Sequence, residues 1–427
     1  MSVIALLGFG TVVLVAMLLL HGYLWWRLVR STTAPGQARR RLTALTAVLA
    51  VLPVLALTLR GTLSRSAAAP LDWIAYSWLG IAFYLFLALL ALEPVRAIGN
   101  AVGRRREGSA APPDRGEVDT ARPGEGTAPD RGAVRPGRDV MTDVAVVPRR
   151  LFLARSLAVT AGAVALGTAG TGAYFAHSAP IVRRVPVTLA GLDPALDGFR
   201  IVTFSDAHLS ATYGGRRFER LVELVNEQRP DVVAIVGDLV DGDVAELGGQ
   251  AAPLADLVTE QGVYFVTGNH EYFVDTNAWL RHLPTLGIDV LRNERVAIGR
   301  GGATFDLAGI DDRTAAASGL PGHGADLDAA LDGRNDATPV VLLAHQPVMV
   351  EQARAAGVGL QLSGHTHGGQ LWPFDHAIRL DQPSVEGLSR HGDTQLYVTS
   401  GGGYWGPPMR VGARPEVTVV ELRAPGS

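Results

Sequence analysis

The stretch "LSGHTHGGQLWPF", residues 362 to 374, places His365 and His367 two positions apart between glycines, directly after an apolar run. At the end of a β-strand, residues i and i+2 point to the same face, so both imidazoles would aim at one place. Imidazole is a common metal ligand. The spacing therefore indicates a metal site. The alternative for this stretch alone is a polar turn that contains two histidines.

Other polar residues also stand where apolar runs end, in a region after about residue 183 that alternates strand and helix patterns. The run "RFERLVELVNEQRP" has apolar residues at helical spacing, and "DVVAIVGDLVD" has the pattern of a buried strand. Side chains at the carboxyl ends of strands converge in α/β sheets, which is where sites assemble. The residues at such ends are Asp206, His208, Asp238, Asp241, Asn269, His270, His345, His365 and His367.

Glycines precede several of these candidates. Gly237, Gly268 and Gly364 each stand directly before one of them. A residue without Cβ allows a tight turn and a close approach of the backbone. We therefore expect the loops to be packed closely around the site.

The composition restricts the chemistry further. The 427 residues include no cysteine, so a thiol nucleophile, a disulfide framework and a thiolate metal site are excluded. Any metal must be held by nitrogen and oxygen. The formal net charge of −3 argues against a nucleic-acid partner, for which a basic domain is expected.

Residues 1–95 are expected to form three transmembrane helices. Three uncharged apolar runs, at 1–26, 42–59 and 73–92, are each about long enough to cross a bilayer. Tryptophans near their ends suit a membrane interface. Buried core helices are the alternative. Residues 96–147 are expected to be a disordered linker, because most of this segment is rich in Pro, Gly, Ala, Arg and Asp.

Residues 148–182 are expected to be an anchor helix that precedes a domain at 183–427. The uncharged stretch 156–181 follows "PRRLFLA", which resembles a twin-arginine export pattern. Arg149 and Arg150 are equally compatible with ordinary anchors on the cytoplasmic side. The following "AHSAP" matches a cleavage site poorly, so we expect the anchor to stay uncleaved.

Arginines predict the orientation in the membrane. They are dense in the loop 22–41 and in 94–155, whereas the loop 60–71 holds two. Arginine-rich loops stay in the cytoplasm. Four crossings then place the C-terminal domain outside, in a multi-pass protein of the cell membrane. Three crossings would leave it in the cytoplasm.

The ordered set "DAH", "GDLVD", "GNHE", "AH" and "GHTH" resembles the calcineurin-like metallophosphoesterase superfamily, over roughly residues 197–423. "GHTHGGQLWP" and "SGGGYWGPPMRVGARPEVTVVEL" look like its membrane-associated branch. The resemblance implies an α/β fold, a four-layer sandwich of two mixed β-sheets flanked by helices. Here α-helical transmembrane segments would precede it.

The resemblance also implies a centre of two divalent metal ions. One ion would be held by Asp206, His208 and His367, the other by Asn269, His345 and His365, with Asp238 bridging the pair. This mixed nitrogen and oxygen set favours Mn, Fe, Zn or Co over Ca or Mg, without deciding among the four.

Three further roles are expected around this centre. His270 matches the family position that protonates the leaving group, the alternative being a hydrogen-bond partner of a ligand. Asp241 would orient a ligand. Arg410 and the loop Gly401–Gly403 would shape the substrate pocket, or form a plain turn.

Together these features predict a membrane-tethered phosphoesterase, a metal-dependent phosphoric ester hydrolase. It would cleave phosphomonoester or phosphodiester bonds by attack of a metal-bridging hydroxide. Tethering suggests a lipid-linked or envelope phosphate as substrate. The alternative is a non-catalytic metal-binding membrane sensor or scaffold, which a missing ligand motif would favour; all five motifs are present.

Overall fold

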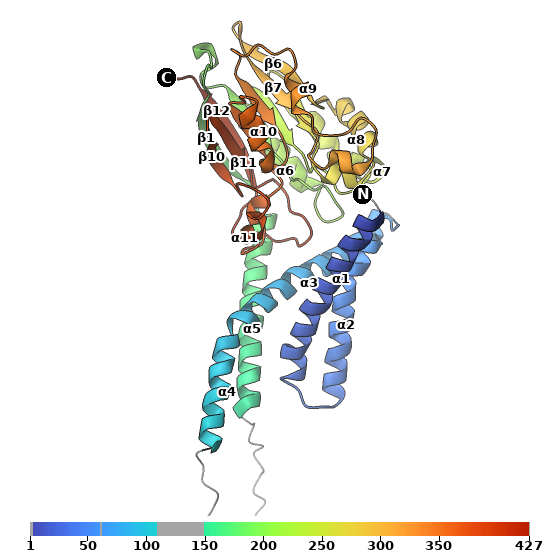
Figure 1. The fold of residues 1–427 in the computed structure, drawn as a ribbon. Helices are drawn as coiled ribbons and strands as arrows, with labels where there is room; N and C mark the ends of the chain where they lie inside the picture. The colour runs from blue at the N-terminus through green and yellow to red at the C-terminus, as the bar shows by residue number, and fades with distance from the viewer. Residues whose placement is uncertain (1–2, 60–61, 109–148, 427) are drawn as a thin grey trace, which may run out of the picture.

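The computed structural model describes residues 3–59, 62–108 and 149–426. It consists of an α/β domain at the C-terminal end and a group of long helices beneath it (Figure 1). The loops between the strands of the domain carry the candidate site.

Two six-stranded mixed sheets form the centre of the domain. The first has the strand order β1-β12-β2-β3-β4-β5. Its strands are β1 (Ile181–Thr188), β12 (Glu416–Arg423), β2 (Arg200–Phe204), β3 (Val232–Val236), β4 (Val263–Val266) and β5 (Ile288–Val290). β2 to β5 run parallel, β1 is parallel to β12, and β12 is antiparallel to β2.

The second sheet has the order β10-β11-β9-β8-β7-β6. Its strands are β10 (Gly387–His391), β11 (Thr394–Val398), β9 (Leu360–Ser363), β8 (Val340–Leu343), β7 (Ala303–Gly309) and β6 (Glu294–Arg300). β11, β9, β8 and β7 run parallel, with an antiparallel strand at each edge. The parallel strands of both sheets are short apolar runs, which is typical of sheets covered on both faces.

The two sheets pack face to face, and helices cover both outer faces. Phe199 of the first layer and Phe305 of β7 meet edge to face in the shared core, 5.3 Å between ring centroids. α6 (Arg216–Glu227), α7 (Val244–Ala251) and α8 (Thr276–His282) cover the first sheet. α9 (Leu327–Leu331) and α10 (Val350–Ala355) cover the second, and α11 (Asp375–Ile378) lies in a loop. The predicted four-layer sandwich is confirmed.

Long helices make up the N-terminal part. They are α1 (Val3–Leu24) with the π-helical turn η1 (Trp25–Arg30), α2 (Gln37–Thr58), α3 (Arg65–Ala91), α4 (Glu93–Gly108) and α5 (Arg149–His177). Among the described residues, four stretches are long and apolar enough to cross a membrane, namely Gly10–Arg30, Gln37–Thr58, Ser66–Ala91 and Arg149–His177. Helices therefore cover most of the described residues that were predicted as three spans and an anchor. The number of crossings stays a prediction.

The expected linker is wrong for residues 96–108, which belong to α4. Pro94 stands in the first turn of that helix, where its missing N–H costs nothing. Val95, Ile98 and Val102 recur at helical spacing, and Gly99 lies against Leu153 of α5. The rest of the linker prediction lies outside the described residues. The domain itself begins at Ile181, two residues before the predicted 183.

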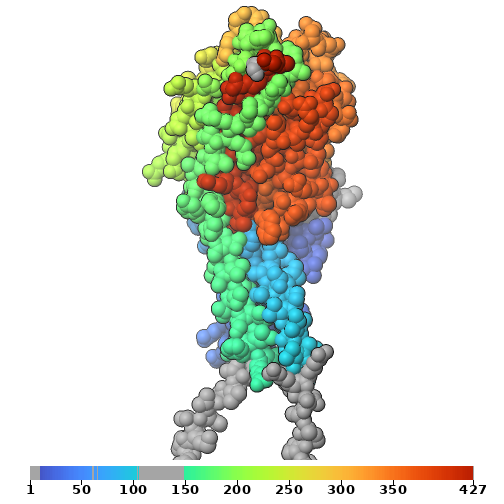
Figure 2. Space-filling model, turned by 90° about the vertical axis from the view of Figure 1, so that its left-hand side faces the viewer, coloured from blue at the N-terminus to red at the C-terminus, as the bar shows by residue number. Residues whose placement is uncertain are grey.

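The helices α3 and α5 pack directly on the domain, and Figure 2 shows α5 reaching up to its C-terminal strands. The backbone N–H of Arg410 donates to the carbonyl of Gly172 in α5, at 2.9 Å. A Cβ on Gly172 would lie 2.6 Å from Cγ2 of Val411. In α3, a Cβ on Gly80 would lie 2.6 Å from Sδ of Met409. Small residues therefore let both helices approach the loop 407–412 closely.

This contact predicts a position-dependent effect within one helix. Gly172→Val should overpack the contact with Val411 and lower the free energy of unfolding by about 1–3 kcal/mol. Gly170→Val is the matched control, because nothing lies within 4 Å of the Cβ position. Thermal unfolding of the detergent-solubilised chain measures both. Equal loss of stability in the two variants would contradict the contact.

Candidate metal centre

The nine candidates lie in loops that follow the parallel strands of both sheets. Asp206 and His208 follow β2, and Asp238 and Asp241 follow β3. Asn269 and His270 follow β4, His345 follows β8, and His365 and His367 follow β9. The carboxyl ends of the parallel strands in the two sheets lie close together and bring these loops to one place.

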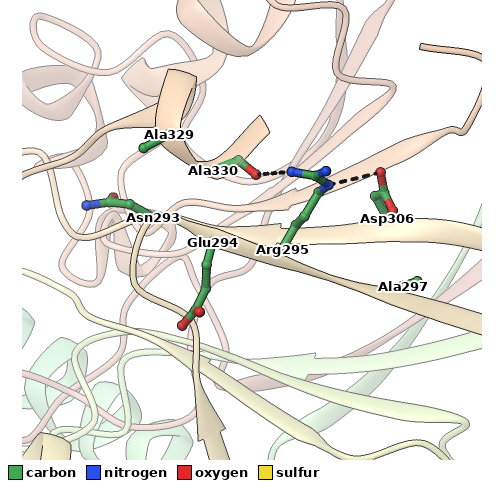
Figure 3. Close-up of a pocket in the computed structure, with 7 residues that line it drawn as sticks. All are labelled: Asn293, Glu294, Arg295, Ala297, Asp306, Ala329 and Ala330. Atoms are coloured by element: carbon green, nitrogen blue, oxygen red, sulfur yellow. Dashed lines mark hydrogen bonds and ion pairs between the residues drawn. The ribbon is translucent and has the colours of Figure 1, made fainter. Parts of the chain in front are cut away.

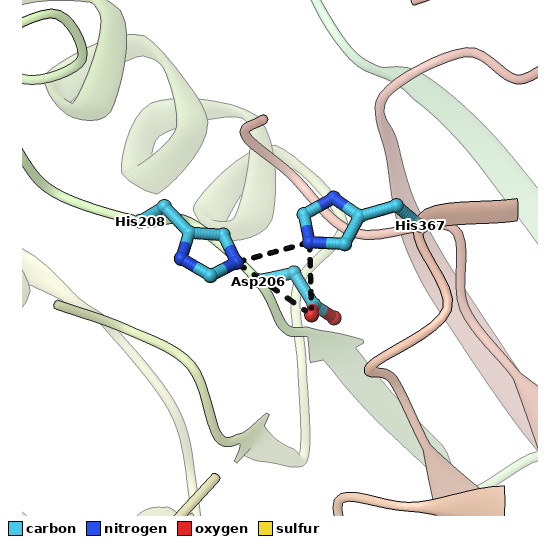
Figure 4. Close-up of side chains that lie close together, drawn as sticks. All are labelled: Asp206, His208 and His367. Carbon is cyan, nitrogen blue, oxygen red and sulfur yellow. Dashed lines mark hydrogen bonds and ion pairs between the residues drawn. The ribbon is translucent and has the colours of Figure 1, made fainter. Parts of the chain in front are cut away.

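Asp206, His208 and His367 form the first group (Figure 4). Nε2 of His208 lies 2.9 Å from Nε2 of His367. Oδ1 of Asp206 lies 3.3 Å from Nε2 of His367 and 3.9 Å from Nε2 of His208. All three side chains are buried. Three donor atoms therefore point at one small volume.

Asp238, His345 and His365 form a second group beside the first. Oδ2 of Asp238 lies 3.2 Å from Nε2 of His345 and 3.8 Å from Nε2 of His208. One carboxylate oxygen is thus within reach of donors of both groups. The geometry fits the bridging role predicted for Asp238.

Asn269 joins this arrangement through the loop it begins. It is the residue before the 3-10 turn η4 (His270–Phe273), and the N–H of His270 donates to Oδ1 of Asp238 at 2.8 Å. The side-chain oxygen Oδ1 of Asn269 is buried and has no hydrogen-bond partner among the described residues. Buried polar atoms without a partner are rare in proteins, and a ligand is one reason for them.

The protonation pattern of the histidines fits a metal. Nδ1 of His208 lies 3.0 Å from Oδ1 of Asp241, and Nδ1 of His345 lies 2.8 Å from the carbonyl oxygen of Val236. Nδ1 therefore donates in each ring, and Nε2 is the nitrogen that would face a metal. Ligating histidines are held in this way by acceptors behind them. Burial alone would lower the pKa of His345, but the carboxylate of Asp238 raises it well above its usual value, so this ring would give up its Nε2 proton to a metal. Nε2 of His345 is also buried without a hydrogen bond.

Two further histidines are neutral near pH 7. Burial, together with the neighbouring imidazole of His345, lowers the pKa of His365 to about 3. Burial, with the guanidinium of Arg410, holds the pKa of His367 well below its usual value. A ligating histidine must be neutral, and the lowered pKa values of these two rings meet that condition. The donor set fits two divalent ions of the transition series.

His270 differs from His365 and His367, because it keeps its proton. Burial alone would lower its pKa, but the carboxylates of Asp238 and Asp241 raise it to about 9. Nδ1 lies 2.7 Å from Oδ1 of Asp241, and Nε2 lies 4.0 Å from Oδ2 of Asp238. The ring therefore holds a proton on Nε2, the nitrogen that faces the two groups of predicted metal ligands.

The comparisons with known proteins agree with this geometry. The model of the calcineurin-like phosphoesterase family matches residues 199–369. An uncharacterized metallophosphoesterase of Helicobacter pylori is 36% identical over 259 residues, which are 60% of this chain and 68% of that protein. The chain belongs to the calcineurin-like phosphoesterase family.

A relative in Danio rerio, described as a transmembrane protein with metallophosphoesterase domain, is 42% identical over 59% of this chain. A Bos taurus protein of the same description is 40% identical over 65% of the chain. The matches span 59% and 64% of those proteins' own lengths. A solved dimetal phosphatase of Danio rerio is 14% identical with a TM-score of 0.32, covering 48% of this chain and 88% of that one. The resemblance to the membrane-associated branch is confirmed.

The backbone of the candidate centre is strained at five of the predicted ligands. Asp206, His208, Asp238, His365 and His367 all have φ between 48° and 71°, in the left-handed region that side chains with a Cβ seldom adopt. Such conformations cost of order 1–3 kcal/mol each and persist where surrounding structure enforces them. These left-handed conformations direct the side chains of successive loops toward the candidate metal centre.

The glycines before the ligands leave no room for a side chain. A Cβ on Gly237 would lie 2.7 Å from Nδ1 of His345. A Cβ on Gly268 would collide with the carboxylate of Asp238, and one on Gly364 with Ser205 and Asp206. The close packing expected from the sequence is present at all three positions.

Asp241 and Glu271 hold the loops from behind. Oδ1 of Asp241 accepts hydrogen bonds from the rings of both His208 and His270, so it orients them as predicted. Glu271 was not predicted. Its buried carboxylate accepts the N–H groups of Gly268, Asp238 and Leu239 and so ties the loop after β3 to the loop after β4. The sequence could have indicated this role, because Glu271 stands in the motif "GNHE", directly after His270.

Arg410 is buried, and its expected role in shaping the substrate pocket, like the alternative of a plain turn, stays a prediction. Its guanidinium is fully buried and donates to the carbonyls of His367, Ser400 and Gly403. Nη2 also lies 3.2 Å from Nδ1 of His367. Arg410 fixes the ring and backbone of a predicted ligand. The loop Gly401–Gly403 packs against the β2 loop, because a Cβ on Gly401 would lie 2.7 Å from Cβ of Asp206.

A separate cavity lies between β6, β7 and α9 (Figure 3). Its cationic side chain, Arg295, is paired with Asp306 at 3.5 Å and donates to the carbonyl of Ala330. None of the predicted ligands is among the residues that line it. The chemistry of the domain therefore concentrates at the strand ends and not in this cavity.

The two donor groups predict a metal content. The full chain should bind two divalent ions, and His365→Ala and His367→Ala should each lower the content by about one, because each removes a ligand of a different ion. Elemental analysis after manganese loading and desalting measures this. His391→Ala, on β10 beside Glu351, should keep both ions. Unchanged content in both ligand variants would contradict the assignment.

Proposed function

We propose that the chain is a membrane-tethered phosphoesterase with a binuclear metal centre. The observation that carries this proposal is the convergence of two donor groups on the shared carboxylate of Asp238, with a protonated His270 beside them. A structural metal site needs closed coordination and no adjacent acid. The substrate is a phosphomonoester or phosphodiester.

Metal ions in this position supply charge for the phosphoryl oxygens and a water of lowered pKa as the nucleophile. The chain's own residues do the rest. Asp206, His208 and His367 would hold one ion, Asn269, His345 and His365 would hold the other, and Asp238 would contact both. Asp241 keeps His208 and His270 in their orientations.

His270 completes the reaction. When the ester bond between phosphorus and the leaving oxygen breaks, that oxygen gains the electron pair and needs a proton. The protonated ring donates it from Nε2, while Nδ1 stays hydrogen-bonded to Asp241. A good leaving group needs this proton less than a poor one does.

This mechanism predicts how the full chain responds to two substitutions. With manganese, Asp238→Ala should abolish hydrolysis of p-nitrophenyl phosphate and bis-p-nitrophenyl phosphate. His270→Asn should lower kcat by about 10²–10⁴ on phenyl phosphate, less on p-nitrophenyl phosphate, and leave the metal content unchanged.

His391→Asn serves as the control and should match the wild type. Equal losses of His270→Asn on both leaving groups would contradict the acid role. Turnover that survives in Asp238→Ala would contradict the metal mechanism. A metal-loaded wild type that hydrolyses no phosphate ester would favour the non-catalytic sensor or scaffold instead.

We also propose that the domain lies outside the cytoplasm. The support comes from the arrangement of the helices, because α5 runs from the α4 end up to the domain (Figure 1). The side chain of Arg155 in α5 donates to the carbonyl of Thr32, and Arg27 pairs with Glu93. The arginine-rich loops thus gather at the end opposite the domain, which the positive-inside rule assigns to the cytoplasm.

The absence of cysteine allows a direct test of this orientation. Ala317→Cys, exposed in the domain, should react with a membrane-impermeant maleimide in intact cells. Ala34→Cys, exposed between α1 and α2, should react only after permeabilisation. The reverse pattern would place the domain in the cytoplasm.

A further inference from the structure

Two large aromatic side chains lie exposed beside the ring that donates the proton. The rings of Phe273 and Trp405 meet the ring of His270 edge to face, with centroids 5.1 Å and 5.5 Å away. Phe273 is 64% exposed and Trp405 is 47% exposed. Exposed aromatic groups that flank an otherwise polar centre mark a binding surface for something apolar.

Trp405 is held in position and is not exposed by looseness of its loop. Its backbone N–H donates to Oε1 of Gln370 at 3.0 Å, and Nε2 of Gln370 donates to the backbone carbonyls of Trp405 and Pro407. These bonds tie the loop after β11 to the loop that carries His367. The backbone that carries the indole is thus fixed relative to the predicted metal ligands.

The apolar surface continues from Trp405 toward the helices that can span a membrane. Pro407 and Met409, in the same loop, contact α3 at Gly80. The neighbouring loop exposes Trp372 and Phe374, and the hydroxyl of Tyr84 in α3 donates to the carbonyl of Trp372. Apolar residues therefore lie between Trp405 and a candidate span, with Met409 buried against α3 and Trp372 and Phe374 exposed.

We propose that Phe273 and Trp405 bind the apolar leaving group of the phosphate ester, so that the substrate is a phosphate ester of a lipid that reaches the site from the bilayer. His270 protonates the leaving oxygen, so the side chains that touch its ring lie on the leaving-group side of phosphorus. This inference rests on the proposed phosphoesterase function. It adds which part of the substrate is apolar and which residues select it.

A polar leaving group is a poorer fit to this surface. A sugar needs hydrogen-bonding partners, because buried polar groups without them are costly. The two aromatic rings offer contact area and no strong acceptor. A nucleobase could stack on an indole, but the continuity with α3 favours an amphiphile that stays in the membrane.

The test compares two leaving groups in one preparation of the manganese-loaded full chain in mixed micelles. Alkyl phosphates and alkyl methyl phosphates, with butyl or dodecyl as the leaving alcohol, cover monoester and diester chemistry. The measured quantity is the ratio of kcat/KM for dodecyl over butyl. This ratio does not depend on the fraction of active protein, so a partly misfolded variant remains informative.

The wild type should prefer dodecyl, and Trp405→Ala and Phe273→Ala should each lower the ratio by about tenfold, the size of effect that lost apolar contacts have on specificity. Trp405→Phe should keep most of the preference. Val258→Ala is the control, because this exposed residue lies in the loop after η3 (Ala252–Asp256). It should leave the ratio unchanged.

An unchanged ratio in both alanine variants would overturn this inference while leaving the phosphoesterase function intact. Preference for a nucleoside ester over the dodecyl ester, lost in the same variants, would overturn the assignment of a lipid. Absence of turnover on every ester would instead overturn the proposed function on which the inference depends.

Discussion

The burial of carboxylates and imidazoles in one small volume is the constraint on which the rest of the structure depends. Asp206, His208 and His345 are almost inaccessible to solvent, and Asp238 lies among them. Removing a charged group from water costs several kcal/mol unless an opposite charge offsets it. Two cations would offset it here. The left-handed backbone conformation of the predicted ligands, the glycines that precede them and the carboxylate of Glu271 all stabilise this arrangement.

The long N-terminal helices pack on the same arrangement. Arg410 connects α5 with the candidate metal centre. Its backbone N–H donates to the carbonyl of Gly172 in α5, and its guanidinium donates to the backbone carbonyl and lies against the ring of His367. Trp73 of α3 stacks on His177 at the end of α5, which in turn lies against Tyr404. The loop beside the centre is therefore braced by helices that can span a membrane.

Much of the domain could be predicted from local patterns, because short apolar runs that end in polar residues define strand ends. The positions of Asp238 and His345, and the orienting role of Asp241, follow from that rule. The roles of Arg410 and Trp405 could not be predicted in this way. Arg410 is buried and Trp405 is exposed because of the packing of loops that lie far apart in the sequence. α4 was missed because its arginine-rich end resembles the segment that follows, whereas its apolar spacing is brief.

The central claim is that two cations sit side by side around Asp238. Electron paramagnetic resonance of the manganese-loaded full chain tests it most directly, because two Mn²⁺ ions about 3.5–4 Å apart share a ligand and couple magnetically. The account predicts the spectrum of an exchange-coupled pair. The six-line spectrum of isolated ions at full loading, or no protein-bound manganese, would contradict it.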